Sequence, residues 1–160
     1  MGESHLKHWN ERGEAHMVDV SSKGESVRQA TAQGWLSMTE ETLRRFREGS
    51  LDKGDAAAVA RVAGISAAKK TGELIPLCHP LRLSGVAVEI IPHPPEKIEV
   101  TATVRCTERT GVEMEALTSV SVACLTLYDM LKSLDKGITI GPIRLLEKTG
   151  GKSGDWKVHG

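Results

Sequence analysis

The chain has 160 residues, and its 21 basic and 21 acidic side chains leave a formal net charge of zero at pH 7. This length suggests one domain with an ordinary core, and the balanced charge argues against a general binder of nucleic acid or membrane surfaces, because such binding depends on excess positive charge. No apolar run approaches the ~20 residues of a membrane span, the N-terminal stretch 1–17 lacks the apolar core of a signal peptide, and the three cysteines form no CxxC pair. We therefore expect a cytoplasmic protein with reduced thiols.

The first predicted elements are two strands and a helix. Residues 16–22 predict a short strand, and residues 28–38 are a weaker strand candidate. Residues 39–49 predict a helix, because Thr39 can cap its start, acidic residues fill its first turn and Gly49 can end it.

A second helix and a hairpin follow along the chain. Residues 55–70 predict the helix, with Asp55 as its N-cap. Gly64 inside it costs about 1 kcal/mol relative to alanine, which often marks a close approach of two backbones. Residues 85–93 and 97–108 flank the turn sequence PHPPE and predict an antiparallel hairpin.

The last elements are a long helix and a strand. Residues 112–134 carry the longest helical pattern, and residues 138–148 predict a closing strand before a glycine-rich tail. Helices mixed with adjacent strands, without strict alternation of the two, predict a single-domain α+β fold in which helices cover an antiparallel sheet.

The apolar stretch GELIPLCHPLRL, residues 72–83, holds a titratable pair at its centre. Cys78 and His79 lie side by side between Pro76 and Pro80, whose rings restrict the backbone. A metal site, a catalytic pair and a packed turn all fit this pattern. We interpret Cys78 as a small packed hydrophobe and His79 as a contact to a bound molecule, although a free cysteine can also serve as a nucleophile.

The end of the long helical pattern carries a second candidate pair. Asp129 and Lys132 are three apart, and they share a helix face with Thr118, Val122 and Leu125. The carboxylate therefore continues a mostly apolar stripe, and a half-buried Asp beside a Lys is a candidate acid–base pair. The alternative is an exposed ion pair, worth only about 0.3 kcal/mol.

Two acidic residues stand near the start of the same pattern. Glu113 and Glu115 diverge by roughly 200° on a helix but share a face on a strand. If both serve one site, the segment is extended before the helix begins. The alternative is that both stabilise the helix N-terminus through its dipole.

Two lysines occupy glycine-containing loops. Lys53 and Gly54 precede a predicted helix start, where backbone amides and a lysine suit an anion. Lys152 lies in TGGKSGD, which can wrap phosphates but is not a Walker A loop, because position 146 is Leu146 instead of glycine. Solvated lysines in flexible loops are the alternative for both.

Six stretches occur in an order that is much more specific than any one of them. They are GEAHMVDVS, KGD, AKKTGELIPLCHPL, TGVEMEALT, LYDMLK and IGPIRLLEKTGGKSGD. With them, the sequence from Gly13 to Asp155 resembles the molybdenum cofactor biosynthesis protein C family, the cyclic pyranopterin monophosphate synthases. We expect a flexible lead over residues 1–12, a single catalytic domain over 13–156 and a tail over 157–160.

The resemblance implies a ferredoxin-like α+β fold and a homohexamer built as a trimer of dimers. It implies a lyase that converts 3′,8-cyclo-7,8-dihydroguanosine 5′-triphosphate to cyclic pyranopterin monophosphate and pyrophosphate. It implies no obligatory redox cofactor and leaves room for Mg²⁺ carried by the triphosphate. The partners are then this nucleotide and further copies of the chain, without nucleic acid or membrane.

The resemblance also assigns residues. Asp129 matches the family's active-site acid, and Lys132 is the lysine beside it. The matched substrate-contact and functional positions are Leu77, Cys78, His79, Met114, Glu115, Glu113 and Lys53, and the loop lysine Lys152 is a candidate phosphate contact.

The spacing of two of these residues raises a question of assembly. On one unbroken helix, Glu115 and Asp129 are 14 residues apart, or about 21 Å at 1.5 Å per residue. A nucleotide-sized substrate would struggle to touch both. We therefore expect a composite site at a subunit interface, with the two residues supplied by different chains.

Two other functions fit parts of the pattern. A metal-dependent hydrolase would use His16, Asp19, Cys78 and His79, although no clustered His or Cys motif has the spacing of a zinc site. A non-catalytic oligomeric module would bind a nucleotide without turnover.

Overall fold

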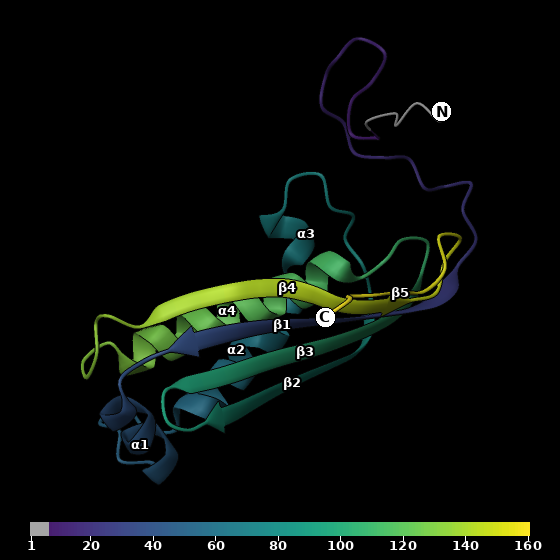
Figure 1. Cartoon of the computed structure of the whole chain (residues 1–160). Helices are drawn as coiled ribbons and strands as arrows, with labels where there is room; N and C mark the ends of the chain where they lie inside the picture. The colour runs from purple at the N-terminus through teal and green to yellow at the C-terminus, as the bar shows by residue number, and fades with distance from the viewer. Residues whose placement is uncertain (1–6) are drawn as a thin grey trace.

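The computed structural model describes residues 7–160, which form a five-stranded antiparallel sheet with helices on one face (Figure 1). The strand order is β2-β3-β1-β4-β5. The elements are β1 (Ser26–Ser37), α1 (Glu40–Glu48), α2 (Ala56–Lys69), α3 (Thr71–Leu74), β2 (Leu83–His93), β3 (Lys97–Glu108), α4 (Glu113–Leu131), β4 (Thr139–Thr149) and β5 (Trp156–Lys157). The predicted α+β class and the predicted hairpin, β2–β3, are confirmed.

The connectivity is ferredoxin-like. The long elements follow one another as β1-α2-β2-β3-α4-β4, which is the split β-α-β pattern, and the two central strands are β1 and β3. These two pair along their whole length, from Ser26 opposite Glu108 to Ser37 opposite Lys97. The C-terminal end of β3 therefore lies beside the first residues of β1, and the start of α4 follows at this same end of the sheet.

Alternation along the central strands explains which face the helices cover. Ala30, Ala32 and Leu36 of β1 are buried, and so are their inward counterparts on β3. The opposite face is polar, as the 3.0 Å hydrogen bond between the Thr31 and Thr103 hydroxyls shows. Small alanines on the inner face let the helices approach the sheet closely.

The predicted helix caps are confirmed. The Thr39 hydroxyl accepts from the backbone amide of Thr42 at 3.2 Å, and Gly49 ends α1 in the left-handed region at φ 70°. Asp55 accepts from the amide of Ala58 at 3.0 Å at the start of α2. Each of these residue types closes a helix end that would otherwise leave backbone groups unpaired.

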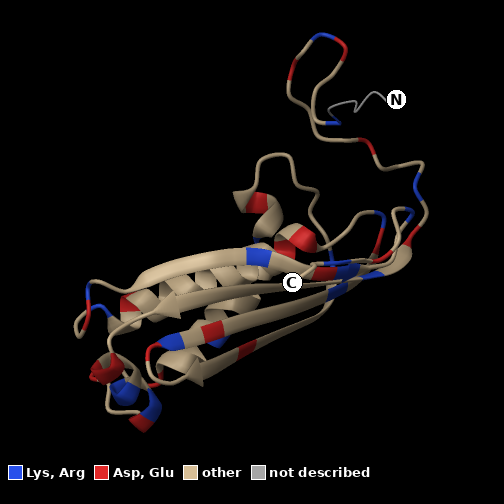
Figure 2. Cartoon of the chain, viewed as in Figure 1, with Lys and Arg blue, Asp and Glu red and all other residues tan. Residues whose placement is uncertain are grey.

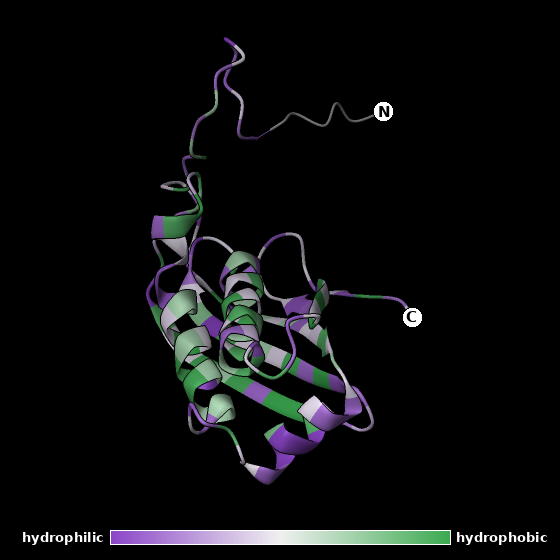
Figure 3. Ribbon diagram, turned by 90° about the vertical axis from the view of Figure 1, so that its left-hand side faces the viewer, coloured by the Kyte–Doolittle hydropathy of each residue, from purple (hydrophilic) through white to green (hydrophobic). Residues whose placement is uncertain are grey.

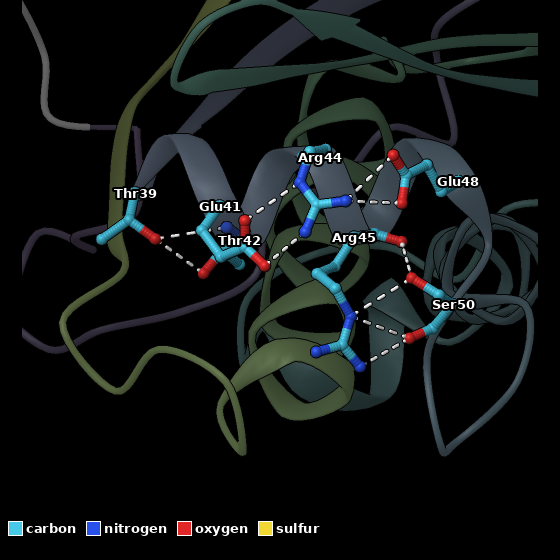
Figure 4. A network of polar contacts seen from close by, with 7 residues as sticks. All are labelled: Thr39, Glu41, Thr42, Arg44, Arg45, Glu48 and Ser50. Carbon is cyan, nitrogen blue, oxygen red and sulfur yellow. Dashed lines mark hydrogen bonds and ion pairs between the residues drawn. The ribbon is translucent and has the colours of Figure 1, made fainter.

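Arg44 organises the exposed surface of α1 (Figure 4). Its guanidinium lies 2.5 Å from the Glu41 carboxylate and 2.9 Å from that of Glu48, one turn away on either side. Such exposed pairs stabilise a helix by only about 0.3–0.5 kcal/mol each, so the position of α1 depends on its buried Leu43.

The helices α2 and α4 lie side by side over the sheet (Figure 3). A Cβ on Gly64 would lie 3.1 Å from the Ser119 carbonyl oxygen, which confirms that this glycine marks a close backbone approach. By length and composition α4 could cross a membrane, but half of its apolar window is buried inside the fold, as expected for the central helix of a core.

The predicted strand over residues 16–22 is wrong. This segment has no regular secondary structure and pairs with none of the five strands. Its carbonyl groups contact the side chains of His79 and Arg109 instead. The actual strand β1 begins at Ser26, two residues before the predicted start, and the short elements α3 and β5 were not predicted. Of the predicted N-terminal lead, residues 1–6 lie outside the described residues.

Candidate functional site

The predicted site residues lie mainly at the two ends of α4. Its charged residues are Glu113 and Glu115 in the first turn and Asp129 near the end, and the stretch between them is uncharged (Figure 2). The helix is unbroken from Glu113 to Leu131, so the two ends are about 21 Å apart between Glu115 and Asp129. One chain therefore presents two separate clusters.

The cluster at the C-terminal end of α4 is an ion triad. Lys132 Nζ lies 3.0 Å from Asp129 Oδ1, and Lys53 Nζ lies 4.0 Å from the same oxygen. Lys53 also donates to the Asp129 backbone carbonyl at 2.9 Å. The hydrogen bond from Lys132 and the charge of Lys53 lower the pKa of Asp129, so this carboxyl is ionised at neutral pH.

The expectation of a half-buried Asp129 is wrong for the single chain. Its side chain is 60% exposed, and Leu125, one turn earlier on the same face, is 59% exposed. The reason is that α4 turns a different face, with Val120, Ala123 and Leu127, toward the sheet. The part of this stripe that carries Leu125 and Asp129 therefore faces outward, whereas Thr118 and Glu115 further back along the helix are buried.

A cavity of about 490 Å³ lies at the N-terminal end of α4. The loop after α3 and the first turn of α4 line it together. Of the predicted residues, this cavity gathers Leu77, Cys78, His79, Glu113 and Met114. Residues far apart in the sequence thus meet at one end of the helix.

Glu115 lies beside this cavity but is only 2% exposed. The Cys78 thiol donates to its Oε2 at 3.8 Å, and its Oε1 is buried without a hydrogen-bond partner in the part of the chain that the structure describes. Burial, helped by the charge of Glu113, raises the pKa of Glu115 to about 7. Burial also raises the pKa of Cys78 to about 11, so its thiol is not activated as a nucleophile.

Glu113 and Glu115 point to different partners, as their helical spacing requires. Glu113 lies 3.0 Å from Lys148 Nζ on β4, and Lys148 also donates to the Ser153 hydroxyl at 3.3 Å. Lys148 was not among the predicted residues. Its place in β4 could have indicated a role, because Lys148 lies opposite the buried Ala30. A lysine on this inner face of the sheet needs a charged partner.

The N-terminal segment is tied to the cavity loop. His79 Nε2 lies 2.5 Å from the Val18 carbonyl oxygen, which can only accept, so this ring nitrogen carries the proton. Arg109 donates to the Ser21 carbonyl at 3.3 Å on the same segment. Residues 16–22, predicted as a strand, therefore form an irregular strap that the side chains of His79 and Arg109 hold against the cavity loop and the end of β3.

Lys152 lies in a second hollow, of about 500 Å³, next to the Lys148–Ser153 contact. Lys23 and Arg28 line this hollow as well, and the buried Ser26 hydroxyl has no hydrogen-bond partner among residues 7–160. With Lys7, four cations and one carboxylate, Glu25, surround this hollow beside a glycine-rich loop, an arrangement that suits an anion with several charges. The phosphate contact expected of Lys152 stays a prediction.

The four residues of the hydrolase hypothesis are not assembled into a metal-ligand group. Within the described range, no three His, Cys, Asp or Glu side chains gather in that way. His79 instead contacts the Val18 carbonyl, and Asp19 accepts from the amide of Ser21 at 2.9 Å.

Comparisons with known proteins identify the family of the chain. The solved structure of a de novo designed protein, Foldit4, is 14% identical and matches 78% of this chain and 99% of its own, but its TM-score of 0.31 is too low to indicate a shared fold. The sequence model of the MoaC family matches residues 17–151. With this match over most of its length, the chain belongs to the MoaC family, the cyclic pyranopterin monophosphate synthases of molybdenum cofactor biosynthesis.

Proposed function

We propose that the chain is a lyase that converts 3′,8-cyclo-7,8-dihydroguanosine 5′-triphosphate to cyclic pyranopterin monophosphate and pyrophosphate. The family supports a role in molybdenum cofactor biosynthesis. The observation that carries the proposal is a pair of carboxyl groups in opposite surroundings: Asp129 lies in solvent beside Lys132 and Lys53, whereas Glu115 is buried beside a thiol. Asp129 is an ionised acceptor, whereas Glu115 keeps a proton up to about pH 7. Rebuilding a purine as a pterin needs proton transfers at several atoms, and such a pair can both take and give protons.

The two clusters form one site when two chains meet. Val122 lies midway between Glu115 and Asp129, and the stripe that joins them is exposed at Leu125. If two copies of α4 pack antiparallel about a two-fold axis near Val122, the end of α4 that carries Glu115 in one chain lies beside the end that carries Asp129 of the partner subunit. The resemblance that predicts a hexamer, as a trimer of dimers, includes such two-fold contacts. We therefore assign the site to a subunit interface.

Cationic side chains near both clusters can bind the triphosphate of the substrate. Lys132 and Lys53 lie in one cluster, and the hollow with Lys152 and Arg28 adjoins the other. When a substrate hydroxyl attacks the α-phosphorus, its proton passes to a base and pyrophosphate leaves with charge that these cations stabilise. Mg²⁺ would arrive with the triphosphate, and the proposed reaction needs no redox cofactor. We expect this reaction in the cytoplasm.

The ionisation states suggest a division of roles. Asp129 is suited to accept a proton, and Lys132, 3.0 Å away, to return one. His79 and Met114 line the cavity at the other end and would orient the ring system. We expect His79→Ala to lose most of the activity, because its ring faces both the cavity and the N-terminal strap.

The test is incubation of the purified protein with the cyclised dihydro-GTP, followed by mass detection of the pterin product and an assay for pyrophosphate. The proposal predicts both products in equal amounts from the wild-type protein, and neither from Asp129→Asn. Binding of the nucleotide without any product would instead favour the non-catalytic module.

A further inference from the structure

The starting observation is the order of two side chains between the core and the cavity. Cys78 lines the cavity, whereas Glu115 is 2% exposed and does not line it. The thiol lies 3.8 Å from Glu115 Oε2. The Cys78 side chain therefore stands between the buried carboxyl group and the space where a ligand can bind.

The surroundings of the carboxyl group favour its neutral form. Glu113 on the same helix adds a like charge, although Lys148 from β4 pairs with it. The thiol of Cys78, from the loop, contacts Glu115, and Cys106, from β3, lies near enough for the Glu115 charge to help raise its pKa. None of the ion pairs found in residues 7–160 includes Glu115, and its Oε1 has no partner. A buried carboxyl without a cation keeps its proton, because desolvation disfavours its charged form.

We propose that Cys78 relays a proton between Glu115 and a substrate in the cavity. In this step the thiol gives its hydrogen to a basic atom of the substrate and takes the proton of the Glu115 carboxyl group. The thiol is neutral before and after, and Glu115 becomes a carboxylate. Solvent or a later step of the reaction returns the proton to Glu115. The relay rests on the proposed function for its substrate, but the coupling between the two side chains does not.

The loop is built to hold this thiol in place. The Cys78 amide donates to the Ile75 carbonyl at 3.1 Å, which closes a turn. A Cβ on Gly72 would lie 3.0 Å from the Pro80 Cα, so the two ends of the loop are in close contact. Two prolines further restrict its backbone. With a pKa of about 11, the thiol keeps its hydrogen through the neutral range, as a relay requires.

The first test uses the free protein without substrate. Infrared spectra against pH would follow the carboxylic-acid C=O band that Glu115→Gln lacks. The thiol lowers the pKa of Glu115 by donating to it. Cys78→Ala should therefore move the loss of this band to higher pH, and Cys78→Ser, whose hydroxyl is a stronger donor, to lower pH. A band that titrates at the same pH in all three proteins would overturn the coupling.

The second test measures turnover of the cyclised dihydro-GTP. Cys78→Ser can still relay a proton and should keep substantial activity, whereas Cys78→Ala should lose about 100-fold in kcat, the usual contribution of a positioned acid–base group. If Cys78 only filled space, the two small residues would behave alike. Equal rates for serine and alanine variants of normal melting temperature contradict the relay and leave the proposed function standing. A wild-type protein without turnover contradicts the proposed function, and the infrared result still decides the coupling.

Discussion

Glu115 and Asp129 show how one helix can hold two carboxyl groups in opposite states. Asp129 lies in solvent with two lysines, which favour its charge. Glu115 is buried near a second carboxylate, and burial together with this like charge disfavours its ionisation more than the hydrogen bond from the Cys78 thiol favours it. The sequence predicts the residue types and the helix but not these states, because they depend on which face of α4 the sheet covers.

The raised pKa of Glu115 predicts a pH dependence of stability. In the unfolded chain this group loses its proton near its ordinary pKa of 4.5, and in the folded protein near 7. The folded state therefore holds more protons between these values, so its stability falls as the pH rises through this window, by about 3 kcal/mol in all. Glu115→Gln lacks this loss. The unfolding free energy of the variant relative to wild type should rise from pH 4.5 to pH 7 and then level off; a constant difference would count against the buried acid.

Asp129 and Lys132 give a prediction that separates activity from folding. Both side chains are at least half exposed, so Asp129→Asn and Lys132→Ala should change the melting temperature little. Turnover should fall by at least about 100-fold in each variant, because each removes a proton-transfer or charge-stabilising group. Near-normal turnover in both variants would contradict a catalytic role for Asp129 and Lys132.

Among the elements, the helix ends are predicted correctly from neighbouring residues, whereas the strands depend on distant partners. The sequence predicts the caps at Thr39, Gly49 and Asp55 correctly, because a cap forms its hydrogen bonds within one turn of its own helix. The predicted strand at 16–22 is wrong because a strand also needs a partner, and this segment pairs with none of the five strands and contacts side chains instead. The two-residue β5 is likewise defined by its pairing with β4 and not by its own pattern.

The close contact between β1 and α4 predicts that one methyl group added at Gly34 destabilises the fold. A Cβ on Gly34 would lie 2.5 Å from Val120 Cγ1 and 3.1 Å from the sulfur of Cys124. Gly34→Ala should therefore destabilise the fold by roughly 1–3 kcal/mol through overpacking. Gly85→Ala on β2 is the matched control, because nothing lies within 4 Å of its added Cβ. Urea unfolding of the two variants checks this, and similar midpoints would show that β1 and α4 are less tightly packed.

In the whole molecule, the sequence predicts that the two clusters are separate, but it predicts only some of the residues that each cluster contains. Helix geometry alone places Glu115 and Asp129 far apart. Lys148 joins the first cluster only through the pairing of β4 with β1. The strap from Val18 to Ser21 joins it through contacts with His79 and Arg109, which no sequence period encodes. That the two clusters act together across two chains stays a prediction.

Subunit mixing shows whether one active site takes residues from two chains. Glu115→Ala and Asp129→Ala proteins, each inactive alone, are mixed under conditions that exchange subunits, and turnover is measured with mass detection of the pterin product. In a two-fold pair of different variants, one site receives both wild-type residues and the other receives neither. Half of the random pairs are mixed and each has one intact site of two, so the account predicts recovery of about a quarter of the wild-type activity. Mixed oligomers that form, as shown by native mass spectrometry, but stay inactive would contradict a site shared between chains.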